Sequence, residues 1–220
     1  HPDAELMLIG EGPGSEEDRQ GLPFVGPAGE LLTKIIQAME MKREDLYIAN
    51  IVKCRPPGNR DPEPDEIAAC APYLQRQLEV LDPAVVVTLG RFSMGHFRPG
   101  ERITQIHGTQ APAPDATGTR DAVAFALFHP AAALRSTEVE RQSYEDIAGL
   151  PRVLEAARAR RAPQPAGGMA PDAANTAVTT AAAAAADAVP QDAPEFVTML
   201  DVEVADTLVD DGPTLFESEP

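Results

Sequence analysis

The sequence predicts an α/β protein built in three layers, α/β/α, with a four-stranded parallel sheet between two layers of helices. Four short apolar runs are spaced along residues 1–162, and segments with helical periodicity separate them. This alternation favours a parallel sheet, because each crossover helix returns the chain to the same edge. We therefore expect the carboxyl ends of the strands to meet at one edge, where ligands bind in such folds.

The four expected strands are continuous and apolar, as strands buried on both faces should be. They comprise residues 6–10, 46–52, 85–90 and 122–128. The expected helices comprise residues 28–41, 65–81, 91–97 and 144–161. Pro64 suits the first turn of the second helix, and Asp61 or Asp65 its cap.

The last part of the chain differs from the rest in composition. Residues 163–220 contain no Lys or Arg, while Ala, Pro, Asp and Glu dominate, so most of the net charge of −17 belongs to them. Such a segment cannot bury enough apolar surface to offset its chain entropy. The sequence thus predicts a folded domain at 1–162 and a disordered acidic tail at 163–220. A locally basic face of the domain could still bind nucleic acid.

Targeting and redox signals are few. No apolar run is long enough to span a membrane, and no signal peptide is visible. Only two cysteines occur, so a structural disulfide is not expected. These features predict a cytoplasmic monomer without a membrane partner. Because the chain opens on His1 and not on Met, we expect it to begin inside a longer protein.

A glycine-rich turn follows the first expected strand. Its sequence is GEGPG, Gly10–Gly14, and glycines there let the backbone approach a ligand closely. No Gly-Lys-Ser/Thr follows, and Glu11 and Glu17 are carboxylates, so this is not a phosphate-binding loop. Phe24, in the glycine-bounded segment that follows, could present its ring to a planar ligand. The alternative is a plain tight turn.

Two further polar residues stand at strand ends. Asn50 interrupts an apolar strand, and its carboxamide can donate and accept together, as reading a nucleobase edge requires. His129 ends the last expected strand, where a neutral imidazole could stabilise developing negative charge. Each has a structural alternative: Asn50 could bond neighbouring backbone, and His129 could be a packing residue.

Several segments together resemble the iron–sulfur, family 4 uracil-DNA glycosylases. In chain order they are GEGPGSEEDRQGLPFVGPAGELL, NIVKCRPPGNRDPEPDEIAAC, TLGRFSMGHF, IHGT and HPAAALR. The resemblance covers about residues 6–154 and leaves the tail out. It implies a uracil-DNA glycosylase-like fold and a base-excision repair enzyme. Such an enzyme flips uracil out of DNA and hydrolyses its N-glycosidic bond, leaving an abasic site.

The resemblance also implies roles for the pocket residues. Glu11 would lie near the scissile bond, and Asn50 and His129 would hydrogen-bond the uracil. Phe24 would stack on the base, and Glu17 would stand near C5, where it excludes a thymine methyl. The backbone that would line the pocket comes from Gly10, Gly12 and Pro13.

A second group of residues would contact DNA around the flipped nucleotide. The loop after His129 would enter the duplex. Basic side chains near the pocket would contact phosphates, although scattered arginines are often only solvated surface. The expected DNA-binding residues are Arg55, Arg60, Arg91, Leu134 and Arg135.

The cofactor of the resembled family is a 4Fe-4S cluster, which takes four thiolates. Cys54 and Cys70 would supply two of them, and the family's other pair lies upstream of the first strand. Either an N-terminal segment is missing, which His1 favours, or the cluster has been lost. A pair of buried thiols without a metal is the remaining alternative.

Two function classes remain open. A glycosylase that turns over is favoured over a protein that binds uracil-DNA without releasing product. A related group binds covalently through a His after an inserted Arg-rich loop, whereas here His107 lacks such an insertion. In the tail, Thr214-Leu215-Phe216 faintly resembles peptides that dock on bacterial sliding clamps, which predicts the clamp as a second partner; an inert linker end is the alternative.

Overall fold

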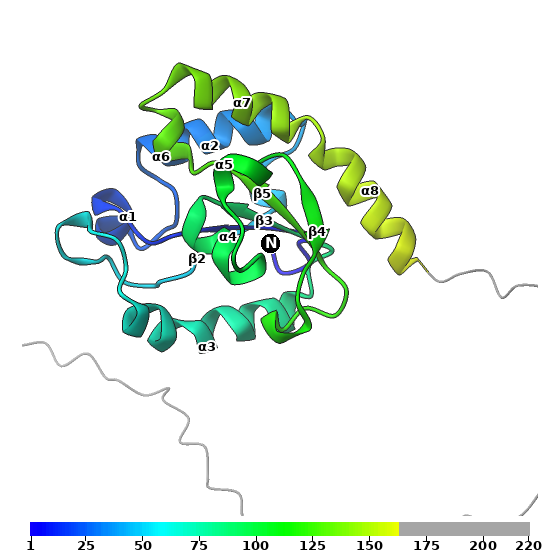
Figure 1. Ribbon diagram of the computed structural model, residues 1–220, viewed down its shortest axis with the longest axis horizontal. Helices are drawn as coiled ribbons and strands as arrows, with labels where there is room; N and C mark the ends of the chain where they lie inside the picture. The colour runs from blue at the N-terminus through cyan, green and yellow to red at the C-terminus, as the bar shows by residue number, and fades with distance from the viewer. Residues whose placement is uncertain (163–220) are drawn as a thin grey trace, which may run out of the picture. The chain divides into compact units, whose positions relative to one another are not determined.

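The computed structural model describes residues 1–162, in which helices cover both faces of a five-stranded sheet (Figure 1). The strands are β1 (Leu6–Gly10), β2 (Tyr47–Asn50), β3 (Val85–Leu89), β4 (Gln110–Pro112) and β5 (Val123–Leu127). Their order across the sheet is β2-β1-β3-β5-β4. The first three and β5 run parallel, as predicted, whereas β4 pairs with β5 in the antiparallel direction.

The prediction of four strands missed β4. This strand has three residues, ends on Pro112 and has its first and last residues exposed, so neither its length nor its apolar pattern distinguishes it from a loop. The four parallel strands are confirmed. Every residue of β1, β3 and β5 is buried, as their continuous apolar sequences predicted.

Alternate side chains of the strands enter two cores. Leu6 and Leu8 face a layer of α2 (Pro27–Gln37), α6 (Pro130–Ala133), α7 (Thr137–Ile147) and α8 (Leu150–Arg161). Met7 and Ile9 face the opposite layer of α3 (Pro64–Leu81) and α4 (Arg91–Phe97). Figure 1 shows α2 and α7 on one side of the sheet and α3 on the other. Burial of each such side chain contributes about 1.5–3 kcal/mol, so both helical layers are held by the hydrophobic effect.

The helix boundaries follow local signals in most places. α3 begins with Pro64 at its first position, as expected, but its N-cap is Glu63 and not Asp61 or Asp65. The carboxylate of Glu66 accepts a hydrogen bond from the Glu63 amide at 2.8 Å, which satisfies one of the free donors at this end.

Other boundaries differ from the prediction. The single helix expected at 144–161 is two helices, α7 and α8, which break at Ala148 and Gly149 just before Pro151. The helix expected at 28–41 ends at Gln37. Two short helices, α1 (Ser15–Gln20) and α5 (Ile103–Ile106), occupy segments that were read as loops. Three-residue 3₁₀ helices lie at Arg43–Asp45, Pro57–Asn59 and Asp115–Thr117.

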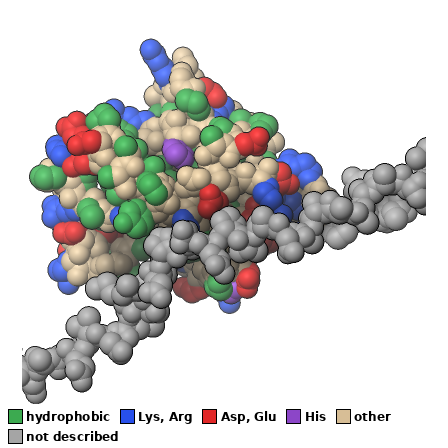
Figure 2. All heavy atoms as spheres, turned by 90° about the horizontal axis from the view of Figure 1, so that it is seen from below, with side chains coloured by type: hydrophobic (Ala, Val, Ile, Leu, Met, Phe, Trp, Pro, Cys, Tyr) green, Lys and Arg blue, Asp and Glu red, His purple; other side chains and the backbone are tan. Residues whose placement is uncertain are grey.

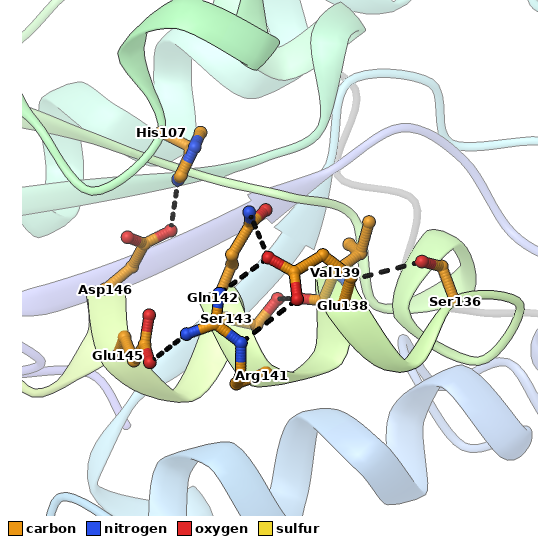
Figure 3. Close-up of polar contacts among 9 residues, drawn as sticks. All are labelled: His107, Ser136, Glu138, Val139, Arg141, Gln142, Ser143, Glu145 and Asp146. Atoms are coloured by element: carbon orange, nitrogen blue, oxygen red, sulfur yellow. Dashed lines mark hydrogen bonds and ion pairs between the residues drawn. The ribbon is translucent and has the colours of Figure 1, made fainter.

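Polar contacts fix α7 to its surroundings (Figure 3). Ser136 caps its start by accepting a hydrogen bond from the Val139 amide. On its exposed face Arg141 pairs with Glu138 and Glu145, one turn away on each side. At its end Asp146 lies 2.8 Å from Nδ1 of His107, which ties the segment after α5 to this helix.

No helix within 1–162 is both long and apolar enough to cross a membrane. The predicted tail, 163–220, and its clamp-like peptide lie outside the described residues.

Candidate functional site

A cavity of about 500 Å³ opens at the carboxyl ends of the parallel strands. It lies where such sheets bind ligands, because the loops that follow the strands converge there. Most of the predicted site residues meet in it. They are Glu11, Gly12, Pro13, Glu17, Phe24, Asn50, Arg60, Arg91, His129 and Arg135. Gly10, Arg55 and Leu134 do not line it.

The turn after β1 forms one wall of the cavity. A Cβ on Gly10 would lie 2.4 Å from the Phe24 ring and 2.6 Å from Asn50 Oδ1, so a side chain cannot fit there. Gly12 is crowded in the same way by Val52. The amides of Ile51 and Val52 donate to the carbonyls of Gly10 and Glu11, at 3.0 and 2.9 Å. The turn is therefore a rigid continuation of the pairing between β1 and β2.

Phe24 supplies the aromatic surface that the sequence predicted. Its side chain is 6% exposed, and its ring centroid lies 5.7 Å from that of His129 at an angle of 34°. The residue has a positive φ of 53°, which is rare for a bulky side chain. A conformation of this kind persists only where the surrounding structure holds it.

Asn50 ends β2 and is 6% exposed. Its Oδ1 is the one buried side-chain oxygen or nitrogen within 1–162 that has no hydrogen-bond partner. The structural alternative, in which this carbonyl bonds neighbouring backbone, is therefore wrong. A buried acceptor without a partner is unfavourable, and this oxygen can accept a hydrogen bond from a donor that reaches it.

His129 caps the short helix α6. Its Nδ1 accepts a hydrogen bond from the Ala131 amide at 3.1 Å, so the proton of the neutral ring is on Nε2. Burial, reinforced by the positive charge of Arg135, lowers the pKa of His129 to about 4. The imidazole is thus neutral at physiological pH and can donate from Nε2. It packs against Gly90, where a Cβ would lie 2.8 Å from that of His129.

Glu11 is the carboxylate that lies on the turn itself. Burial raises its pKa above the usual value, the negative charge of Asp61 raises it further, and Arg91 opposes both effects. A half-buried carboxylate with a raised pKa in a cleft is typical of a group used in catalysis.

Glu17 lines the cavity, but its carboxylate is occupied. Oε2 accepts a hydrogen bond from the Gly14 amide at 3.1 Å. Oε1 accepts from the amides of Val25 and Gly26 at 2.9 and 2.8 Å. This side chain therefore joins the turn after β1 to the loop that carries Phe24.

Three of the predicted DNA-binding residues, Arg60, Arg91 and Arg135, line the cavity, and most of the predicted arginines are paired with other side chains. Arg60 forms two hydrogen bonds with Glu66, and Arg91 pairs with Asp61 and stacks on Phe92. Arg55 donates to Asn59 at 2.7 Å. Arg135 is exposed, and Leu134 at the end of α6 is 52% exposed.

The surface view agrees with this mixture of charges. Basic and acidic side chains lie next to one another on the face that Figure 2 shows, where grey atoms do not cover it.

The two cysteines lie in and after the loop that follows β2. Cys54 is exposed, and Cys70 on α3 is half-buried. The Lys53 amide donates to Cys70 Sγ at 3.3 Å. Across residues 1–162 no three His, Cys, Asp or Glu side chains group as metal ligands. The cysteines present are half of the thiolates that a cubane cluster needs.

His107 lies outside the cavity lining. Its Nδ1 is held by Asp146 (Figure 3). Its ring centroid lies 4.5 Å from that of Phe128, which is itself in the lining.

Sequence reasoning missed two residues. Asp61, considered only as a helix cap, lines the cavity and pairs with Arg91. Its position in a proline-rich loop of mixed charge gave no signal for this role. Arg43 contacts the Phe24 loop from a distant segment, and its sequence context is that of a solvated charge.

Comparisons with known proteins show the family to which the chain belongs. The model of the "Uracil DNA glycosylase superfamily" matches residues 1–148. A type-4 uracil-DNA glycosylase of Sulfurisphaera tokodaii is 43% identical over 153 residues, which are 67% of this chain and 69% of the relative. One of Thermotoga maritima is 44% identical over 66% of this chain and 75% of its own. One of Saccharolobus solfataricus is 45% identical over 66% and 68%. The chain therefore belongs to the uracil DNA glycosylase superfamily, and within it to the type-4 uracil-DNA glycosylases.

Proposed function

We infer that this protein is a uracil-DNA glycosylase, which releases free uracil from DNA and leaves an abasic site. One structural observation carries the inference: the buried, unpartnered carboxamide of Asn50 beside an aromatic surface and a neutral histidine. The membership of the family supports the same activity.

Asn50 is the residue that recognises the base. Its unpartnered Oδ1 accepts the N3–H of uracil, while its Nδ2 donates to O4. Cytosine presents an amino group where uracil has O4 and has no proton on N3, so both hydrogen bonds would be lost. A site built for such bonds rejects a base that cannot make them, because its buried groups stay unpaired. Phe24 stacks on the flipped base and replaces the neighbours that the base leaves.

His129 stabilises the leaving group. When the bond between C1′ and N1 breaks, the electron pair moves onto the uracil ring and its O2. The Nε2–H of the neutral imidazole donates a hydrogen bond to that oxygen. Because the donor is held by the Ala131 amide on the other ring nitrogen, it needs no reorganisation during the reaction.

Glu11 acts on the sugar side. Its carboxylate favours the positive charge that develops at C1′ and orients the water that attacks there. The new bond forms between this water and C1′, its proton passes to the carboxylate, and the base leaves as an anion. The group must be ionised for both roles.

Glu17 and the wall beside it exclude thymine. We place C5 of the base against this side of the cavity, where the carboxylate is fixed by three amides and cannot move away from a methyl group. The surrounding DNA is held by Arg55, Arg60, Arg91 and Arg135, while Leu134 fills the space that the flipped nucleotide vacates.

Cys54 and Cys70 would hold half of a 4Fe-4S cluster. The amide hydrogen bond to Cys70 suits a thiolate ligand. The two further thiolates that a cluster needs are not among the 220 residues, which contain only these two cysteines. Such a cluster would supply structure and not redox chemistry, because it would fix the loop at 53–62 that borders the cavity.

The alternative is a protein that binds uracil-DNA without turnover. The structure favours release, because His107 is held by Asp146 away from the cavity lining. A covalent nucleophile would have to face the sugar.

Product analysis separates the two functions. The chain is incubated with a uracil-containing oligonucleotide, and free uracil and abasic sites are measured beside iron content. Asn50→Ala and His129→Ala test the pocket. Arg76→Ala, at an exposed position of α3, serves as the matched control. A cytosine-containing oligonucleotide tests specificity. We expect release by the parent and the control only. A stable adduct without free uracil would support the binder, and no product from iron-replete protein would exclude the enzyme.

A further inference from the structure

The conformation of Phe24 is the starting point. With a φ of 53° it occupies the left-handed region, which bulky side chains avoid. The carbonyl of Phe24 also faces Gly29 on α2, where a Cβ would lie 1.8 Å from that oxygen. The ring therefore reaches the cavity only if the loop is held in this unusual form from both sides.

Arg43 holds the peptide before Phe24. Its Nη2 donates to the Pro23 carbonyl at 2.6 Å, although the two residues are 20 positions apart. Its Nη1 donates to Thr33 Oγ1 at 3.2 Å, and that hydroxyl donates to the Gly29 carbonyl at 2.9 Å. Arg43 thus joins the loop to the first turns of α2, the element against which Phe24 packs.

Glu17 holds the peptide after Phe24. Its carboxylate accepts from the amides of Val25 and Gly26, as described above. Each flank of Phe24 is therefore bound by one charged side chain, Arg43 before it and Glu17 after it. Only Glu17 lines the cavity, whereas Arg43 is half-buried outside it.

We propose that Arg43 is a positioning residue for the base pocket, which acts by holding Phe24 in its left-handed conformation over the flipped uracil. The proposal rests on the proposed function. Without Arg43 the Pro23 carbonyl loses its donor and the loop relaxes to ordinary backbone angles, which withdraws the ring. Asn50, His129 and Glu11 keep their positions. The loss of activity on removing Arg43 should therefore come from weaker stacking of Phe24 on the base.

A double-mutant cycle tests this coupling. Arg43→Ala is made in the parent and in a Phe24→Leu background, which removes the aromatic ring and keeps an apolar side chain. We expect Arg43→Ala to reduce kcat/KM about tenfold or more in the parent, since small misplacements of positioning groups have effects of this size. In the Phe24→Leu background it should change kcat/KM by less than about twofold, because the ring that it positions is already gone.

Further variants separate positioning from folding. Arg43→Lys restores one hydrogen-bond donor and should recover part of the lost kcat/KM. Lys34→Ala, at an exposed position of α2, should leave kcat/KM unchanged. If Arg43→Ala does not fold, Thr33→Val removes one of its two contacts and takes its place in the cycle. The affinity for free uracil, measured by calorimetry, should fall in parallel with kcat/KM.

The outcomes also distinguish the two proposals. Equal losses in both backgrounds, or no loss in the parent, would overturn the role of Arg43 while the glycosylase remains. An iron-replete parent that releases no uracil would overturn the proposed function instead. In that case the cycle would be measured only as the affinity for free uracil. If the effects of Arg43→Ala and Phe24→Leu on that affinity were additive, the positioning role of Arg43 would be overturned as well.

Discussion

The floor of the cavity and its rim differ in how their polar groups are satisfied. On the floor, Asn50 is buried with an unpartnered carbonyl, and Phe24 and His129 are held by fixed contacts. On the rim, Arg60 and Arg91 are exposed, and carboxylates of the same chain already neutralise them. One polar atom of the floor thus lacks a partner, whereas the charged groups of Arg60 and Arg91 on the rim already have partners.

This difference assigns separate tasks to the two regions. We expect the preformed floor to discriminate between bases, because a buried polar group that stays without a hydrogen bond there costs free energy. A rim of exchangeable ion pairs contributes affinity that depends on salt, since exposed pairs are weak and each phosphate contact releases counterions. Substitutions on the floor should therefore change catalysis strongly, and those on the rim should change binding modestly.

The largest effect is expected from Asn50→Ala. Loss of the base-reading amide should reduce kcat/KM by about 10²–10³-fold, as removal of one preorganised hydrogen-bonding group does in other enzymes. The free energy of unfolding should not decrease, because a buried acceptor without a partner is removed. Uracil release and thermal unfolding measured on the same preparations check both points. A matching loss of activity and stability would show that Asn50 is structural.

His129→Ala should reduce kcat/KM by about 10²-fold, and the reduction should not vary with pH from roughly 5 to 8. The pKa of His129 is lowered from 6.5 to about 4, so the parent keeps a neutral donor throughout that range. Protonation would begin to matter only as the pH falls toward 4. Rate profiles of parent and variant check this. If the ratio of the parent's kcat/KM to that of the variant fell as the pH dropped through 6.5, the pKa of His129 would not be lowered.

Arg91→Ala should affect binding and leave kcat unchanged. Removal of one phosphate contact reduces the slope of log K against log salt by about 1 and weakens binding uniformly across sequences. Titrations of uracil-containing DNA between about 50 and 200 mM salt measure the slope. Arg152→Ala, on α8, is the matched control. An unchanged slope would remove Arg91 from the DNA interface.

The smallest effect is expected from Asp61→Asn. Its negative charge raises the pKa of Glu11, so its removal lowers that pKa and moves the acid limb of kcat/KM to lower pH. The same change frees Arg91 and should reduce KM about twofold at low salt. A pH profile beside that of Glu155→Gln, on α8, checks the shift. An acid limb that moves to higher pH would contradict the electrostatic argument.

The sequence was sufficient for those parts of the fold that are set by local patterns. The four parallel strands follow from continuous apolar runs, and their shared carboxyl edge brings Glu11, Asn50 and His129 together. β4 could not be predicted in this way, because its pairing with β5 defines it and its own three residues do not.

The site shows the same limit. Phe24 was predicted from its glycine-bounded loop, but its support by Arg43 depends on a contact between segments 20 residues apart. Glu17 was predicted as a wall near C5, and sequence spacing could not show that three backbone amides occupy its carboxylate. Long-range polar contacts of this kind leave no periodic signal.

The short strand β4 has a consequence for how the folded protein behaves in a crowded solution. An exposed sheet edge offers unpaired amides and carbonyls to other chains and invites aggregation. β4 covers the edge of β5 with only three residues, and Pro112 has no amide hydrogen to offer. On this side of the sheet, therefore, the edge offers few backbone amides and carbonyls with which a strand from a second molecule could pair.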